Sequence, residues 1–360
     1  MQAWLAARMP DASDLVVGPV HFPTEAGRSA ESSFIDLSYE RDGRRVEDHL
    51  VVRREYAGGE IFLGADLTLP WKMMHAVAAH SDVPVPECVG IELDPSVLTT
   101  PFLVMRKKPG RIPSLTPNYN LTGWITDLTP DQRATVWRNG VAQIARVNAI
   151  DWRQGFEFLQ DPAGGPTGLD AYLAWLETWY RWAIGDRHFP LGEAALAHLL
   201  ENRPANPRTQ LMWGDAMPHN VLFNDDLSVS AVLDWEAARL GPGEADLAWW
   251  IFFNELLAQG IEVERLPGLP DRAETVAIYE AESGRRVEDM DYYSLMAEFR
   301  MTVVGVRAGD RRAGGIGRLK VEDMLQNPSA RMLARRMDVP LPEKGPAYEA
   351  SCALLGKGRT

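Results

Sequence analysis

Three polar residues in the second half of the chain have the types and spacing needed to act on a phosphate group. Asp215 follows the apolar run 211–213, Asn220 precedes the run 221–223, and Asp234 follows the run 229–233. Short apolar runs separated by turn residues predict short strands. We therefore expect two carboxylates and one amide at the ends of adjacent strands, where their side chains converge.

These residue types suit a magnesium-dependent reaction. Carboxylate and amide oxygens are preferred ligands of Mg²⁺, which takes few protein ligands when phosphates complete its coordination shell. A second carboxylate, kept off the metal, could accept the proton of a substrate hydroxyl. The order Asp215-x-x-x-x-Asn220 and then Asp234 is the order in which kinases place catalytic base, metal amide and metal carboxylate. Asp and Asn also stabilise turns, so the alternative is a purely structural pair.

Other polar residues near this segment have two open interpretations. Asp246 either caps a helix that begins at Leu247 or braces the site from behind. Glu236 either approaches a second metal or faces solvent. His219 lies inside the loop and is expected to have a structural role there.

Two larger groups of residues are also ambiguous. Most of the tryptophans are expected in the core, although one or two could line an acceptor pocket: Trp175, Trp179, Trp182, Trp249 and Trp250. A basic stretch is expected to be a solvated face, or alternatively a docking patch for an anionic acceptor: Arg300, Arg307, Arg311, Arg312, Arg318 and Lys320.

The elements around these residues predict an α+β chain with two lobes. Alternating and apolar runs predict strands over 33–39, 49–53, 88–93 and 101–105, with a helix over 71–79. Amphipathic patterns predict helices over 131–150, 168–184, 246–258, 271–282 and 291–307. We therefore expect a small β-rich N-terminal lobe over 1–106 and a larger, mostly helical lobe over 107–360.

Composition excludes several classes of protein. With 360 residues, 46% hydrophobic and 24% charged, the chain has the make-up of a globular protein. Its net charge of −13 should repel nucleic acid and anionic lipid, so we expect neither as a partner. The apolar run 247–253 is too short to span a bilayer. Two distant cysteines and the absence of a signal-peptide pattern at the N-terminus favour a cytoplasmic location.

The central segment resembles the signature of the aminoglycoside phosphotransferase-like (APH/choline kinase) small-molecule kinases. The resemblance is carried by the motifs Trp213-Gly214-Asp215-x-x-x-x-Asn220-Val221-Leu222-Phe223, Val232-Leu233-Asp234-Trp235-Glu236 and Gly241-Pro242-x-x-x-Asp246-Leu247-Ala248-Trp249. It covers about residues 20 to 260. It implies a bilobal, protein-kinase-like fold, ATP and Mg²⁺ as cofactors, and a small molecule with a hydroxyl group as phosphate acceptor.

The resemblance also implies roles for single residues. Asp215 is the expected catalytic residue, and Asn220 and Asp234 are the expected metal ligands. The phosphate-binding cation would be Arg53 or Arg54, where the family usually has Lys; we favour Arg53. The remaining expected nucleotide contacts are Ser29 and Ser32, in a phosphate loop over 24–33, and the adenine-facing segment Val104, Met105 and Arg106.

One part of the family pattern is not evident. The acidic partner of the phosphate-binding cation should come from the helix of the small lobe, and only Glu60 or Asp66 lies near the expected place. We predict an ATP-dependent small-molecule kinase. The alternatives are a hydroxyacyl-CoA kinase of the same superfamily, a nucleotide-binding pseudokinase and a protein kinase. Acceptor, nucleotide preference and oligomeric state are not readable from the sequence.

Overall fold

The N-terminal part of the chain forms an antiparallel sheet. The computed structural model describes residues 1–22, 30–55, 61, 64 and 66–356. Within them, the sheet has the order β1-β2-β3-β5-β4. Its strands are β1 (Ser13–His21), β2 (Ala30–Arg41), β3 (Arg44–Glu55), β4 (Cys88–Glu92) and β5 (Phe102–Arg106). The four strands that the sequence predicts are thus confirmed. β1 was not predicted, because Gly18 and Pro19 interrupt its apolar pattern.

Alternation along the strands sends side chains to two different cores. Leu50, Val52 and Val104 pack with Trp4 under the short helix α1 (Gln2–Arg8). Residues on the opposite face, among them Leu103, pack with the predicted helix α2 (Thr68–His80) in a core that continues into the second lobe. Since successive strand residues face opposite sides, Arg53, paired with Leu103, faces the second lobe.

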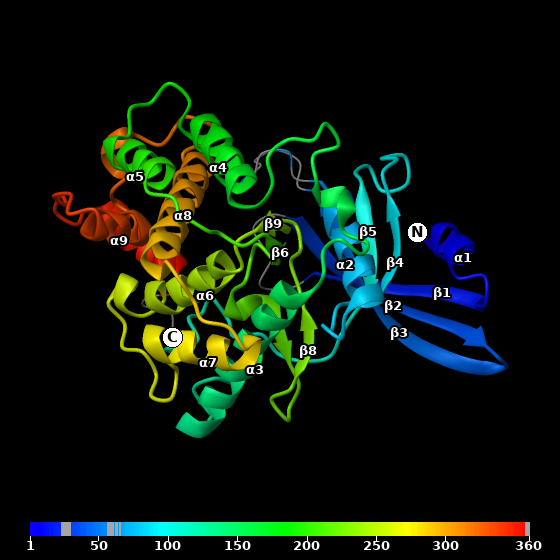
Figure 1. The fold of residues 1–360 in the computed structure, drawn as a ribbon. Coiled ribbons are helices and arrows are strands. Elements are labelled where there is room, and N and C mark those ends of the chain that lie inside the picture. Colours follow the sequence, from blue (N-terminus) through cyan, green and yellow to red (C-terminus); the bar gives the residue numbers. More distant parts are fainter. Residues whose placement is uncertain (23–29, 56–60, 62–63, 65, 357–360) are drawn as a thin grey trace.

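The second lobe is mostly helical (Figure 1). Its helices are α3 (Pro130–Ala149), α4 (Gly168–Ile184), α5 (Pro190–Glu201), α6 (Glu244–Leu256), α7 (Arg272–Ser283), α8 (Met290–Arg312), α9 (Pro328–Arg336) and α10 (Pro346–Leu354). All five helices expected in this lobe are present, and two of them begin with a capping box, at Thr129 and at Asp271. The α+β class with a small β-rich lobe and a larger helical lobe is confirmed. In the described part of the chain, no helix is long and apolar enough to cross a membrane.

The expectation of three adjacent catalytic strands is wrong. β7 (Val221–Phe223) pairs with β8 (Val229–Val232), whereas β6 (Gln210–Met212) pairs with the unpredicted β9 (Arg239–Gly241). The polar residues therefore lie on loops that connect two separate two-stranded ribbons. β9 was not predicted because Arg239-Leu240-Gly241 contains no apolar run, unlike the equally short β6 and β7.

The β7–β8 ribbon also fastens the two lobes together. The N–H of Val232 donates to the carbonyl of Pro84 at 2.7 Å, and Arg111 bridges Phe223 just after the sheet ends. The Val232–Pro84 hydrogen bond thus joins the ribbon to the small lobe, and the Arg111–Phe223 bridge holds the chain against β7 where it enters the second lobe.

Candidate active site

Asp215 lies at the end of β6, in a turn that only glycine permits. Gly214 has a φ of 84°, and a Cβ there would collide with the carbonyl of Ala237. One carboxylate oxygen of Asp215 accepts from Asn220 Nδ2 at 2.8 Å, and the other accepts from Trp249 Nε1 at 2.9 Å. The carboxylate is therefore held from two sides.

Burial changes the acidity of Asp215. Desolvation, opposed by Arg300 and assisted by the charges of Asp234 and Glu236, raises the pKa of Asp215 to about 7. A carboxylate with this pKa exchanges a proton near neutral pH, as an acceptor for a hydroxyl proton should.

Asp246 braces the turn that carries Asp215. Its carboxylate accepts from the backbone N–H groups of Trp213 and Gly214, both at 2.8 Å, and from Asn148 Nδ2 at 3.1 Å. Burial raises the pKa of Asp246 to about 6, against these hydrogen bonds. The bracing interpretation is confirmed. The capping interpretation is wrong, because α6 begins before Asp246, at Glu244.

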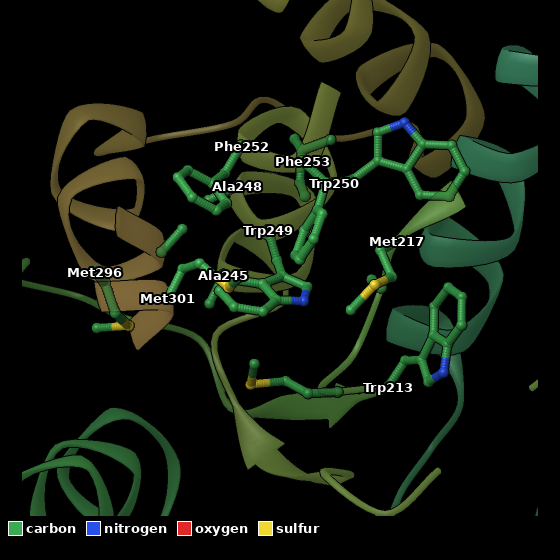
Figure 2. Close-up of a cluster of buried hydrophobic side chains, with 14 of the residues drawn as sticks. Trp213, Met217, Ala245, Ala248, Trp249, Trp250, Phe252, Phe253, Met296 and Met301 are labelled. Atoms are coloured by element: carbon green, nitrogen blue, oxygen red, sulfur yellow. The ribbon is translucent and has the colours of Figure 1, made fainter. Parts of the chain in front are cut away.

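Trp249 and Arg300 belong to the site. Sequence analysis put neither of them beside Asp215: it expected Trp249 in the core or lining an acceptor pocket, and Arg300 on a solvated face or in a docking patch for an anionic acceptor. Trp249 is buried among Met217, Phe252 and Phe253 (Figure 2), yet its indole N–H reaches Asp215. The Arg300 guanidinium lies 4.1 Å from the Trp249 ring centroid, donates to the carbonyl of Gly214, and lies 3.9 Å from Asp215. The motif Gly241-Pro242-x-x-x-Asp246-Leu247-Ala248-Trp249 contained the signal for Trp249.

The basic stretch is not one solvated face. Arg300 and Arg307 are 3% and 4% exposed, so the solvated interpretation is wrong for these two residues. Arg307 lies over the ring of Trp182 and within 3.5 Å of Asp310. Arg311, Arg312 and Arg318 are exposed as expected. His219 packs edge-on against Phe253, in agreement with a structural role in the loop.

Asp234 faces Asp215 from the β8 side and is bound by the small lobe. Its φ of 61° is in the left-handed region, which Asp tolerates better than most residues. Arg53 of β3 donates to Asp234, and also to Glu236 at 2.5 Å. Glu236 therefore does not face solvent. Although burial opposes it, the two carboxylates raise the pKa of Arg53 above its ordinary value.

The donor set fits a magnesium ion that is shared with phosphates. Asn220 uses its side-chain N–H₂ on Asp215, which leaves the amide oxygen for a metal. The carboxylate of Asp234 is the second candidate ligand, and Arg53 would move from it toward a phosphate. No group of three or more His, Cys, Asp or Glu in the described ranges could hold a metal by itself. This set would therefore bind Mg²⁺ tightly only when phosphate oxygens complete the coordination shell of the ion, and weakly without them.

The remaining nucleotide-site predictions lie on the small lobe. Ser32 is the cross-strand partner of Arg53, so both side chains share the face toward the second lobe. Met105 shares that face, whereas Val104 points into the α1 core. The backbone N–H of Arg106 donates to Glu87 inside the sheet, and its guanidinium pairs with Asp48. The adenine contact of Val104, Met105 and Arg106 stays a prediction.

The expected phosphate loop and the expected acidic partner of Arg53 lie only partly within the described residues. Ser29 and Glu60 lie outside the described residues. Asp66 caps α2 by accepting from the N–H groups of Thr68 and Leu69. Within the described ranges, Arg53 forms ion pairs with Asp234 and Glu236 of the second lobe.

A comparison with known families agrees with this geometry. Residues 41–275 match the phosphotransferase enzyme family (APH). The chain belongs to this phosphotransferase family. The match includes Arg53, Asp215, Asn220, Asp234 and Asp246.

Curated relatives of this phosphotransferase are similar over part of its length. It is 28% identical over 213 residues to acyl-CoA dehydrogenase family member 10 of Mus musculus, which covers 57% of the chain. It is also 28% identical over 206 residues, or 54% of the chain, to acyl-CoA dehydrogenase family member 11 of Homo sapiens. The matched regions make up only 18% and 25% of these two relatives.

Solved structures show that the fold is the protein-kinase-like fold of this family. A Ralstonia eutropha protein provisionally described as an aminoglycoside phosphotransferase matches with a TM-score of 0.64 at 19% identity, over 99% of this chain and 98% of that one. A choline/ethanolamine kinase family protein from Mesorhizobium loti matches with a TM-score of 0.54 at 13% identity, over 99% and 98%. The ternary complex of aminoglycoside phosphotransferase APH(4)-Ia with ADP and hygromycin B matches with a TM-score of 0.51 at 15% identity, over 100% and 99%.

Proposed function

We propose that this phosphotransferase is an ATP- and Mg²⁺-dependent kinase that phosphorylates a hydroxyl group of a small molecule. The observation that carries the proposal is the pairing of Asp215 with Asn220 at 2.8 Å, opposite the cluster of Asp234, Glu236 and Arg53. This arrangement joins a proton acceptor, two candidate metal ligands and a phosphate-binding cation across the contact between the lobes.

In the proposed reaction, Asp215 orients the acceptor hydroxyl and takes its proton. The acceptor oxygen bonds to the γ-phosphorus, and the bond from that phosphorus to the β–γ bridging oxygen breaks, leaving ADP. The transition state of such transfers is loose, so alignment and charge neutralisation contribute most of the rate. Asn220 and Trp249 fix the direction of the Asp215 carboxylate, and Arg300 compensates its charge.

Asn220 and Asp234 would hold Mg²⁺ in this reaction. When bound, the metal ion neutralises charge on the phosphates. Arg53 would then bind phosphate oxygens, for which its planar guanidinium is well shaped. Ser32 lies on the same face and would add a hydroxyl donor.

The proposal is tested first by thermal melting with Mg²⁺-ATP, Mg²⁺-free ATP and Mg²⁺-GTP, on wild type and Asp234→Asn. A ligand at about 100 times its Kd adds roughly 2.7 kcal/mol to the folded state, a shift of a few degrees. We expect an upward shift that requires Mg²⁺ and is lost in Asp234→Asn. Asp215→Ala should keep the shift but lose turnover.

Two outcomes would point elsewhere. Equal turnover in wild type and Asp215→Ala would contradict the role of Asp215. Magnesium-dependent ATP binding, with no product from any hydroxyl compound, would favour the nucleotide-binding pseudokinase.

A hydroxyacyl-CoA is the second candidate acceptor. The observation in its favour is the similarity to acyl-CoA dehydrogenase family members 10 and 11. We take from this similarity only the acyl-CoA class of the acceptor; the dehydrogenase reaction is not proposed for this chain, because the matched regions are a minor part of those relatives. Incubation with a hydroxyacyl-CoA and Mg²⁺-ATP, followed by mass analysis, should show a product heavier by one phosphoryl group if this candidate is right.

A further inference from the structure

The arginines around the catalytic turn differ in how they are paired. Asp215 has Arg300, and Asp234 and Glu236 have Arg53. Arg239 of β9 belongs to the same neighbourhood, because it pairs with Met212 at the end of the strand that leads into Asp215. In the described part of the chain, no carboxylate lies within ion-pair distance of Arg239.

Arg239 is held in place by aromatic rings. Its guanidinium lies 3.5 Å from the centroid of Trp175 and 5.1 Å from that of Tyr172, both on α4. Trp175 in turn stacks on Trp179, with ring centroids 5.2 Å apart. The Nε–H donates to the carbonyl of Ala237 at 3.1 Å. The two terminal nitrogens donate to no carbonyl or carboxylate of the described residues, so their N–H groups are available to a ligand.

The local field also disfavours an isolated positive charge at this position. Burial lowers the pKa of Arg239 to about 10; the charge of Arg300 lowers this pKa further, while Tyr172 and Asp246 partly offset the decrease. A buried cation next to a second cation is stabilised when an anion binds between or beside them. Arg239 therefore favours binding of a negatively charged group on the side of the site formed by α4, β9 and α8, although the whole chain is acidic.

We propose that the acceptor carries an anionic group, a carboxylate or a phosphate, which Arg239 binds while Asp215 faces the acceptor hydroxyl. This inference rests on the proposed kinase function and specifies its substrate class. A polycationic amino sugar would place its charges against Arg239 and Arg300, so we expect it to be excluded.

The test compares four classes of hydroxyl compound with Mg²⁺-ATP and detects products by mass. The classes are hydroxycarboxylates of three to eight carbons, the uncharged diols of the same skeletons, hydroxylated phosphomonoesters such as glycerol 3-phosphate, and amino sugars such as kanamycin. We expect products from the carboxylates or from the phosphomonoesters, and the class that reacts identifies the anion. Diols and amino sugars should react at most weakly.

Variants then assign the selectivity to Arg239. Arg239→Gln should raise the KM for the accepted anion by at least about tenfold, the loss expected for a charge-assisted hydrogen bond, with little change in kcat. Arg239→Lys should retain part of the affinity. Arg181→Gln removes the same charge from an exposed position of α4 and should change neither constant. The Mg²⁺-ATP melting shift, unchanged in all three variants, shows that each one folds.

Several outcomes would overturn the inference. Preferred phosphorylation of diols or amino sugars would do so, as would an accepted anion whose KM is the same in Arg239→Gln and wild type. A chain that binds Mg²⁺-ATP yet phosphorylates neither anionic class also contradicts it. The absence of any Mg²⁺-ATP binding would instead contradict the kinase function itself.

Discussion

At the scale of single residues, the chemistry of Asp215 depends on what surrounds its two oxygens. Burial raises its pKa, while Arg300 and the Trp249 N–H favour the charged form. These opposing effects leave the carboxyl group of Asp215 about half-protonated near neutral pH, and two hydrogen bonds fix its orientation. Neither the burial nor the position of Arg300, far along the chain, can be read from the motif around Asp215.

The pKa of Asp215 predicts an acid limb in the pH profile of turnover. A proton acceptor must be deprotonated, so kcat/KM should fall about tenfold for each pH unit below about 7 and level off above it. The profile is measured between pH 5.5 and 8.5 with a saturating nucleotide. Trp249→Phe removes the N–H that lowers this pKa, so its limb should move to higher pH. A flat wild-type profile would contradict the assignment.

At the scale of elements, the site depends on short strands and on one helix N-terminus. α6 brings Asp246 under the turn of Trp213 and Gly214, and it also supplies Trp249. The β6–β9 pairing then places Arg239 beside the same turn. α6 and the β6–β9 ribbon thus shape the turn that carries Asp215, while Asn220 and Arg300 of α8 complete its contacts.

Asp246→Ala should destabilise the fold and reduce turnover together. It leaves two buried backbone N–H groups without their acceptor, at about 1–3 kcal/mol each, so we expect a loss of roughly 3 kcal/mol in the free energy of unfolding. Chemical denaturation measures it. Asp291→Ala is a matched control, since this aspartate of α8 is exposed, and it should change stability by less than about 0.5 kcal/mol. A similar loss in both variants would contradict the bracing role.

At the scale of the whole molecule, the lobes meet through a charge cluster as well as through backbone hydrogen bonds. Arg53 of the small lobe lies on Asp234 and Glu236 of the large lobe, in the place that a metal ion and phosphates would take. In the proposed reaction, Arg53 and the metal ion would compete for Asp234 until a nucleotide offers Arg53 its phosphates.

This competition predicts opposite effects of one substitution. In Arg53→Gln, Mg²⁺ alone should bind more tightly than in wild type, because the cation no longer occupies Asp234. Mg²⁺-ATP should bind about tenfold or more weakly, because a phosphate contact is lost. Titration calorimetry measures both. Arg54→Gln removes a charge from the opposite face of the same strand and should change neither affinity. Weaker Mg²⁺ binding in Arg53→Gln would show that the cation does not compete.

The sequence by itself determined the elements whose signals are local. Each helix that periodicity predicted is present, and so are the four strands predicted in the small lobe. The spacing of Asp215, Asn220 and Asp234 predicted the catalytic segment. These patterns could be read because they depend on neighbouring residues only. Only the tertiary structure shows which strands pair, that Arg53 binds both Asp234 and Glu236, that Arg300 lies beside Asp215, and that Arg239 pairs with Met212. Such contacts join residues far apart in the chain, so packing and charge pairing set them, and no local pattern records them.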